Sequence, residues 1–180
     1  MLKDQIKNLA KAYKSEFIAL RRHLHSHPEL SFQEYKTAEF VEEKLKSFGI
    51  RKLERKANTG IVALIEGKNP EKKTIALRGD MDALPIIEQN EVSYKSKNPG
   101  IMHACGHDVH TASLLGAAKI LSEIKDKLEG TVKWEMIKKA EIKKDAFILT
   151  MSKAQFIHLD WNSFPASKEW RFLVLLKSLS

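Results

Sequence analysis

The sequence predicts a layered α/β domain, in which helices alternate with short buried strands. Three observations support this: a helical spacing of apolar residues near the N-terminus, two short apolar runs bounded by glycine or a turn, and a second helical stripe after residue 108. A chain of 180 residues with 43% apolar residues is the size of about one globular domain. Helices alternating with strands in such a chain are typical of a sheet covered by helices.

The first third of the chain predicts two helices. Residues 2–24 carry apolar side chains every three or four positions, which indicates one amphipathic helix that ends before Pro28. Ser31 and Glu34 are spaced as a capping box and predict the start of a second helix. That helix is expected to run to about Phe48, before a glycine in the position that glycine favours after a helix.

The middle of the chain predicts strands and a third helix. The apolar runs 61–66 and 74–77 are separated by a Lys-Asn-Pro turn and predict two buried strands. Asp108 is expected to cap a helix whose apolar stripe continues to Ile124. A further strand is expected to begin at Thr131, after Gly130.

The composition changes after Lys133. All eight glycines lie at or before Gly130, although about three or four would be expected in the remaining residues at ordinary usage, and all three tryptophans follow Lys133. We therefore predict an N-terminal unit at 1–133 and a divergent, poorly folded tail at 134–180. The tail is either a variable extension or the product of a reading-frame disruption or gene truncation.

Charge and hydropathy favour neither nucleic acid nor membrane as a partner. The formal charge is +8, but lysines alternate with acids, as in residues 43–46, and no run of five basic residues occurs. No apolar run approaches the roughly 20 residues that cross a bilayer. The charged N-terminus and the single cysteine favour the cytoplasm.

The segment from Met102 to His110 contains the only cysteine and three of the seven histidines. Cys105 and His107 are two residues apart, so both side chains can point to one side of an extended or looped backbone. A thiolate and an imidazole bind zinc well. Asp80 and Asp82 follow a predicted strand, where open α/β sheets place their sites. Together these residues predict a metal-dependent hydrolase.

Three motifs occur in the order seen in one family. They are the stretches 21–34, 77–86 and 102–119, with Thr59-Gly-Ile-Val-Ala between the first two. Residues 2–133 resemble the N-terminal part of the metal-dependent amidohydrolases that include hippurate hydrolase, N-acyl-amino-acid amidohydrolases and indole-acetyl-amino-acid hydrolases. The resemblance implies a helix-sheet-helix catalytic domain of zinc-peptidase-like fold, here incomplete and without the lid domain that mediates dimerisation.

The resemblance also implies roles for single residues. Cys105 and His107 are expected to bind two divalent metal ions (zinc, manganese or cobalt), with the cysteine sulfur bridging them, and Asp82 is expected to orient a ligand. Supporting roles are expected for Asp80, Asp108 and His110. Beyond Lys133, Glu141 echoes the family's general base or its neighbouring ligand, and His158 echoes a ligand histidine. His23, His25 and His27 are expected to form a structural element near the site.

The implied reaction is hydrolysis of the amide bond of an N-acyl amino acid or a related small conjugate. Because the second half of the metal site and the lid have no clear counterpart, this chain is expected to be weakly active or inactive, with the family homodimer lost. Two alternatives stay open: a non-catalytic module that binds a metal or a partner, and a basic nucleic-acid binder.

Overall fold

The computed structural model describes residues 1–136, 139–143, 146–152 and 155–160, and their side chains as far as Glu135. The described chain contains four α-helices, one 3₁₀ turn and seven strands. In chain order these are α1 (Leu2–Ala12), α2 (Lys14–Ser26), α3 (Tyr35–Ser47), β1 (Lys52–Lys56), β2 (Gly60–Glu66), β3 (Thr74–Gly79), α4 (His107–Glu123), η1 (Lys125–Lys127), β4 (Thr131–Met136), β5 (Lys139–Lys143), β6 (Ala146–Ser152) and β7 (Gln155–Asp160).

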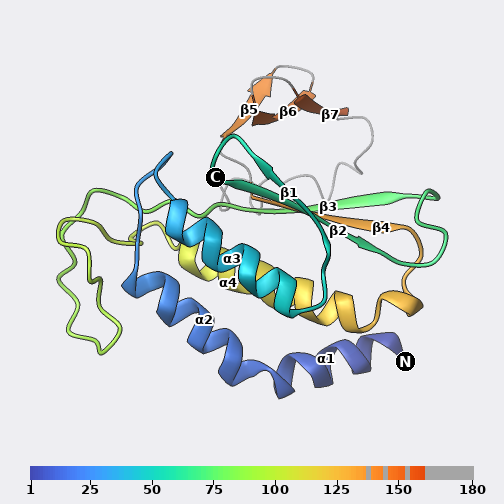
Figure 1. Cartoon of the computed structure of the whole chain (residues 1–180), viewed down its shortest axis with the longest axis horizontal. Helices are drawn as coiled ribbons and strands as arrows, with labels where there is room; N and C mark the ends of the chain where they lie inside the picture. The colour runs from blue at the N-terminus through green and yellow to red at the C-terminus, as the bar shows by residue number, and fades with distance from the viewer. Residues whose placement is uncertain (137–138, 144–145, 153–154, 161–180) are drawn as a thin grey trace.

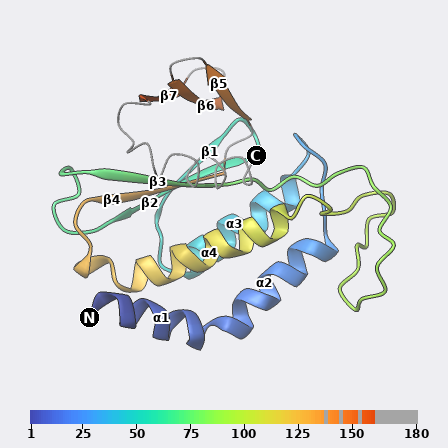
Figure 2. The ribbon, with the colours of Figure 1, turned by 180° about the vertical axis from the view of Figure 1, so that it is seen from behind.

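The main sheet has the strand order β1-β2-β4-β3. Strand β2 pairs antiparallel with both β1 and β4, whereas β3 and β4 are parallel. Helices α3 and α4 cover one face of this sheet, and α2 packs on α4 as an outer layer (Figure 1). The view from behind shows all four helices on the same side (Figure 2). The predicted α/β class is confirmed, and the described residues supply helices on one face of the sheet only.

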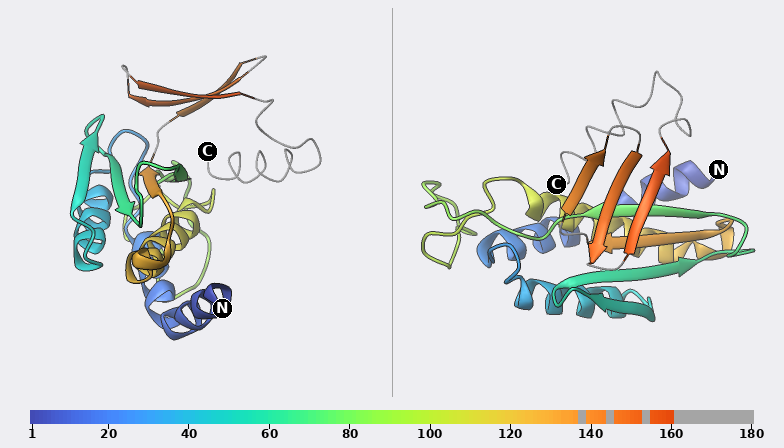
Figure 3. Two further views of the ribbon diagram at one scale, coloured as in Figure 1. Left: turned by 90° about the vertical axis from the view of Figure 1, so that its right-hand side faces the viewer. Right: turned by 90° about the horizontal axis from the view of Figure 1, so that it is seen from above.

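The core lies between the main sheet and helix α4. Trp134 of β4 is fully buried there, and its Nε1 donates to the carbonyl of Leu114 at 3.0 Å, so its one polar atom is satisfied. Helix α4 approaches α2 closely at Gly116, where an added Cβ would lie 3.0 Å from the ring of Phe17. Figure 3 shows α1 and α2 on the far side of α4 from the sheet. Helix α4 is therefore held from both sides.

Most predicted elements are confirmed, but several details were wrong or missed, three of them in residues 2–56. The apolar stripe over 2–24 belongs to two helices, because the backbone breaks at Tyr13. No capping box forms at Ser31: helix α3 begins at Tyr35, and Glu34 instead accepts hydrogen bonds from the Phe32 amide and the Thr59 hydroxyl. Strand β1 was not predicted, because its mostly charged residues carry no apolar signal.

The predicted division after Lys133 falls inside β4. That strand runs to Met136, and its residues pair with both β2 and β3, so Trp134 and Glu135 pack with the N-terminal unit. Farther on, β5, β6 and β7 form a separate antiparallel sheet where no strands were expected. The backbones of Glu141 and His158 both pair with that of Ile148, but their side chains lie outside the described part. None of the described helices combines the length and apolarity required to cross a bilayer.

Candidate metal centre

The candidate site lies where β3 ends and α4 begins. Asp80 and Asp82 directly follow β3, as predicted for a site at the carboxyl end of a strand. Two short backbone pairings hold this segment: the Ala83 amide donates to the Glu29 carbonyl at 2.8 Å, and Leu84 and Met102 exchange hydrogen bonds of 3.0 Å. They bring the aspartate segment next to the loop that carries Cys105.

Cys105, His107 and Asp82 meet at this point. The His107 Nδ1 lies 2.9 Å from the Asp82 Oδ1 and 3.0 Å from the Asp82 carbonyl, and the Cys105 Sγ lies 3.7 Å from the same carbonyl. His107 is buried, whereas the Cys105 thiol is exposed. Because Asp82 occupies the Nδ1 side of the ring, Nε2 is the nitrogen that can bind a metal. A carboxylate behind a ligand histidine is a common arrangement in metal sites.

The electrostatics favour a thiolate beside this imidazole. Burial raises the pKa of Cys105, but the neighbouring imidazoles of His103 and His107 outweigh it and bring the pKa down to about 6. Burial lowers the pKa of His107, but the hydrogen bonds with Asp82 and Cys105 raise it to about 10. A thiol with a low pKa is an effective metal ligand, because the thiolate is the binding form.

Asp80 has a different environment from Asp82. Its buried carboxylate accepts a hydrogen bond of 2.8 Å from Arg78, and its carbonyl accepts one of 2.8 Å from the Thr111 hydroxyl. Burial raises the Asp80 pKa to about 6 in spite of the neighbouring guanidinium. Asp80 therefore connects the end of β3 to α4 through Thr111, and its hydrogen bonds are with Arg78 and Thr111 instead of with Cys105 or His107.

Asp108 does not cap α4, contrary to the prediction. The helix begins at His107 behind Gly106, whose φ of 86° puts a left-handed residue in the N-cap position, and no side chain caps it. Asp108 is fully buried in the first turn, with its Oδ2 2.7 Å from the His25 Nδ1 and 2.9 Å from the Arg21 Nε. The opposite ring nitrogen of His25 lies 3.0 Å from Glu88.

This buried network was missed by the sequence reasoning. The members lie 63 and 83 residues apart in the chain, so no local spacing could connect them. The available signal was the histidine-rich end of α2, in which only His25 is directed into the network, while His23 stacks on Phe40. Of the three histidines that were expected to form a structural element, His25 is therefore the one that contacts the buried carboxylates.

Two further histidines lie near the pair. His103 is buried, and neither of its ring nitrogens has a hydrogen-bond partner of good geometry. The ring of His110 lies 5.9 Å from that of His107, and burial followed by the charge on His107 lowers its pKa. Both rings adjoin the site; the supporting role predicted for His110 stays a prediction.

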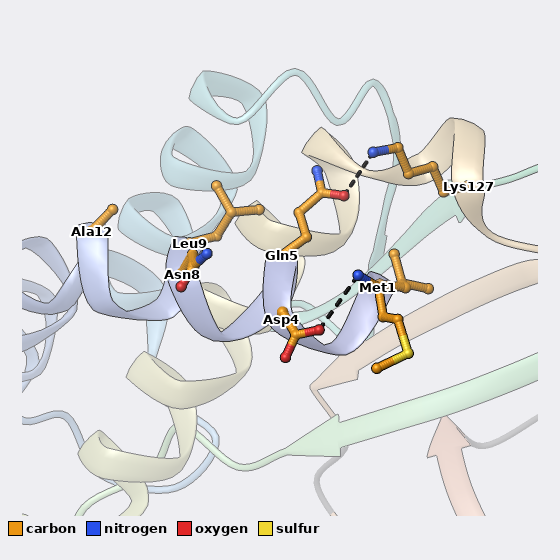
Figure 4. A pocket seen from close by; sticks show the side chains of 8 residues that line it. Met1, Asp4, Gln5, Asn8, Leu9, Ala12 and Lys127 are labelled. Atoms are coloured by element: carbon orange, nitrogen blue, oxygen red, sulfur yellow. Dashed lines mark hydrogen bonds and ion pairs between the residues drawn. The ribbon is translucent and has the colours of Figure 1, made fainter.

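The donor set fits part of a metal centre. Cys105 and His107 supply a thiolate and an imidazole, but over the part of the chain whose side chains are described no three His, Cys, Asp or Glu residues gather as one ligand group. A catalytic zinc site needs about three protein ligands. A large hollow lies elsewhere, between α1 and Lys127, and has no metal-binding histidine or cysteine (Figure 4). The site chemistry therefore rests on the residues at the start of α4.

Comparison with known proteins assigns the N-terminal part. Residues 76–137 match the profile of Peptidase family M20/M25/M40. The chain is 54% identical over 134 residues to an N-acyl-L-amino acid amidohydrolase from Geobacillus stearothermophilus. The aligned part covers 74% of this chain and 36% of that protein. It is also 50% identical over 107 residues to hippurate hydrolase from Campylobacter jejuni, and this aligned part covers 59% of this chain and 28% of that protein. The chain thus spans about a third of such relatives.

Solved structures agree over the same part. A dinuclear metal-binding peptidase of the M20 family from Bacillus subtilis has a TM-score of 0.68 at 42% identity, covering 73% of this chain and 37% of that one. A putative aminohydrolase from methicillin-resistant Staphylococcus aureus has a TM-score of 0.71 at 41% identity, covering 80% and 38%.

A second profile matches the other end. Residues 118–176 match that of YcxB-like protein, which overlaps the first match over residues 118–137. The relatives and the solved structures named above all agree with the first match. The N-terminal part of this chain thus matches Peptidase family M20/M25/M40 and resembles the corresponding part of its members.

Proposed function

We propose that the N-terminal part of this chain is the first section of a metal-dependent amidohydrolase acting on the amide bond of N-acyl amino acids or related small conjugates. The contact of His107 with Asp82 beside the Cys105 thiol carries this proposal, because it prepares two ligands at the carboxyl end of a strand. The names of the relatives, an N-acyl-L-amino acid amidohydrolase and a hippurate hydrolase, support the substrate class.

The residues of the site have separate tasks in this proposal. The Cys105 sulfur and the His107 Nε2 would hold two divalent ions (zinc, manganese or cobalt), which when bound polarise the scissile carbonyl and activate a water molecule. In this role the Asp82 carboxylate accepts a hydrogen bond from the His107 Nδ1 and so fixes the ring orientation. Glu141 is proposed as base or ligand and His158 as ligand, on the strength of their sequence contexts.

The chain by itself is proposed to be weakly active or inactive. The chain is also proposed to lack the family's homodimer and to be located in the cytoplasm. The shortage of donors near Cys105 supports the low activity, since the described side chains offer no third ligand. The same observation favours a second candidate, a non-catalytic module that binds one metal ion or a partner. Metal stoichiometry separates the two: about two ions per chain favours the enzyme, and one or none favours the module.

Cobalt binding tests the ligand pair. We expect the chain to bind Co²⁺ with a sulfur-to-cobalt absorption band, and Cys105→Ser or His107→Gln to weaken binding by about 100-fold, or roughly 2.7 kcal/mol. His23→Gln serves as the control, because this ring stacks on Phe40 and His27 away from the site. If Cys105→Ser binds cobalt as tightly as the unaltered chain, Cys105 is not a ligand and the proposal fails.

Hydrolysis of hippurate and N-acetyl amino acids tests the inactivity of the chain. We expect no turnover that a chelator abolishes, because two ligands do not complete a catalytic site. Chelator-sensitive hydrolysis by the 180-residue chain, lost in Cys105→Ser, would show that the chain supplies the missing ligands itself.

Residues 134–180 are proposed to form a divergent tail of different origin from residues 1–133. Support comes from the absence of glycine after Gly130 and from the match of residues 118–176 to the YcxB-like profile. The neighbouring DNA, read in all frames, tests this. The rest of an M20 protein in a shifted frame would indicate a frame disruption, whereas more YcxB-like sequence in the same reading frame would indicate a fusion of two lineages.

A further inference from the structure

The interior of the molecule contains a charged network beside the metal site. His25 of α2 lies between two carboxylates, with its Nδ1 2.7 Å from Asp108 and its Nε2 3.0 Å from Glu88. All three side chains are at most 4% exposed. A buried cluster of this kind is costly unless each polar atom has a partner, so its members hold one another in fixed positions.

The two hydrogen-bond partners of the His25 ring indicate which of its nitrogens carry a proton. Ionised carboxylates only accept hydrogen bonds, so an imidazole that satisfies one on each side must donate from both nitrogens and carry both protons. Arg21 lies 3.2 Å from the same Nδ1, but the shorter distance to Asp108 identifies the carboxylate as the partner of that nitrogen. Arg21 and His25 as cations then balance Asp108 and Glu88 as anions.

Each carboxylate anchors a different part of the site. Asp108 is in the first turn of α4 and directly follows His107. Glu88 organises the 86–98 loop, where it accepts hydrogen bonds from the Ser96 amide at 2.6 Å and the Asn90 side chain at 3.2 Å. The ring of Tyr94 packs edge-on against His25 and lies near both Arg21 and Arg22.

We propose that His25 is a positioning residue for the metal ligands, which fastens the first turn of α4 to the 86–98 loop as a double hydrogen-bond donor. The idea rests on the proposed function, since the element that it holds carries His107 and follows Cys105. Because α4 starts at a left-handed glycine without a side-chain cap, its first turn is held by side-chain contacts with other elements. On the β3 side, Asp82 contacts His107 and the Asp80 carbonyl accepts from Thr111. On the α2 side, Asp108 is held by His25 and Arg21.

Two measurements on the full chain test the proposal, with His25→Gln compared with His23→Gln. The control is the same substitution on the same helix, and its ring faces Phe40. Cobalt affinity should fall about tenfold in His25→Gln and stay within twofold in the control. Both variants are measured under conditions in which urea unfolding shows that more than about 95% of the protein is folded. In an Asp108→Asn background, His25→Gln should cause little further loss, because the two residues act through one contact.

Amide hydrogen exchange gives a readout that needs no metal. The amides of Val109 and His110, which donate to the Gly106 carbonyl, and that of Ser96 should exchange at least about tenfold faster in His25→Gln, with the strands of the main sheet unchanged. Unchanged exchange at these amides, or a uniform acceleration throughout the fold, overturns the proposal. If exchange changes as expected while the unaltered chain binds no cobalt, the positioning role stands and the proposed function fails.

Discussion

Gly130→Ala is expected to lower the free energy of unfolding by about 2–5 kcal/mol. Gly130 precedes β4 with a φ of 85°, a conformation that costs a residue with a Cβ about 1–2 kcal/mol. The added Cβ would also lie 2.4 Å from the carbonyl oxygen of Lys73, which accepts a hydrogen bond of 2.8 Å from the Thr131 amide. Relieving this overlap would move the parallel pairing of β3 and β4, which adds about 1–3 kcal/mol.

Gly49→Ala is the matched control for the conformational part. Its φ is 81°, yet nothing lies within 4 Å of the position that a Cβ would take. Urea unfolding followed by circular dichroism should therefore show a loss of about 1–2 kcal/mol for Gly49→Ala and a clearly larger loss for Gly130→Ala. Equal losses would mean that the backbone around Lys73 yields without cost, and the close approach of β3 to Gly130 would have no energetic weight.

Elements with an apolar signature could be predicted from the sequence, and elements without one could not. Strand β2 was found because its buried residues form a continuous run between glycines. Strand β1 consists mostly of exposed charged residues, and it is held by backbone pairing with β2 at the edge of the sheet, which leaves no trace in the side-chain pattern. The break at Tyr13 was missed for a related reason: apolar spacing reports which face is covered, but not whether the backbone is continuous.

The site shows the same division between local and distant information. Cys105 and His107 could be proposed from a nine-residue segment, because the residue types and their spacing carry the chemistry. The partnership of Asp108 with His25 could not, since it depends on how α2 packs against α4. Asp108 follows the rule that acidic residues favour the first turn of a helix, but Gly106 already takes the cap position, so its carboxylate turns to the buried histidine.

Glu88→Gln is expected to lower the free energy of unfolding by up to roughly 3 kcal/mol near neutral pH. Burial raises the pKa of Glu88, but hydrogen bonds from the Ser96 amide, His25 and Asn90 outweigh it and lower the pKa from its usual 4.5 to about 2. A pKa lowered by that much in the folded state corresponds to stabilisation of roughly 3 kcal/mol by the ionised form. The neutral amide of the variant keeps part of the hydrogen bonding but loses the charge that faces His25.

The sign of this effect fixes its pH range. Because the folded protein holds Glu88 ionised at pH values where the unfolded chain protonates it, the stabilisation is complete above about pH 4.5 and disappears as the pH falls toward 2. Unfolding measured at a series of pH values should therefore show a large difference between the unaltered chain and Glu88→Gln near pH 6 and almost none near pH 2. Glu91→Gln, in the same loop but paired only with Lys95 at the surface, should change stability by less than about 0.5 kcal/mol at every pH. If Glu88→Gln and Glu91→Gln give the same pH profile, the Glu88 carboxylate is not held as an anion against His25, and the charge balance inferred for the buried network is wrong.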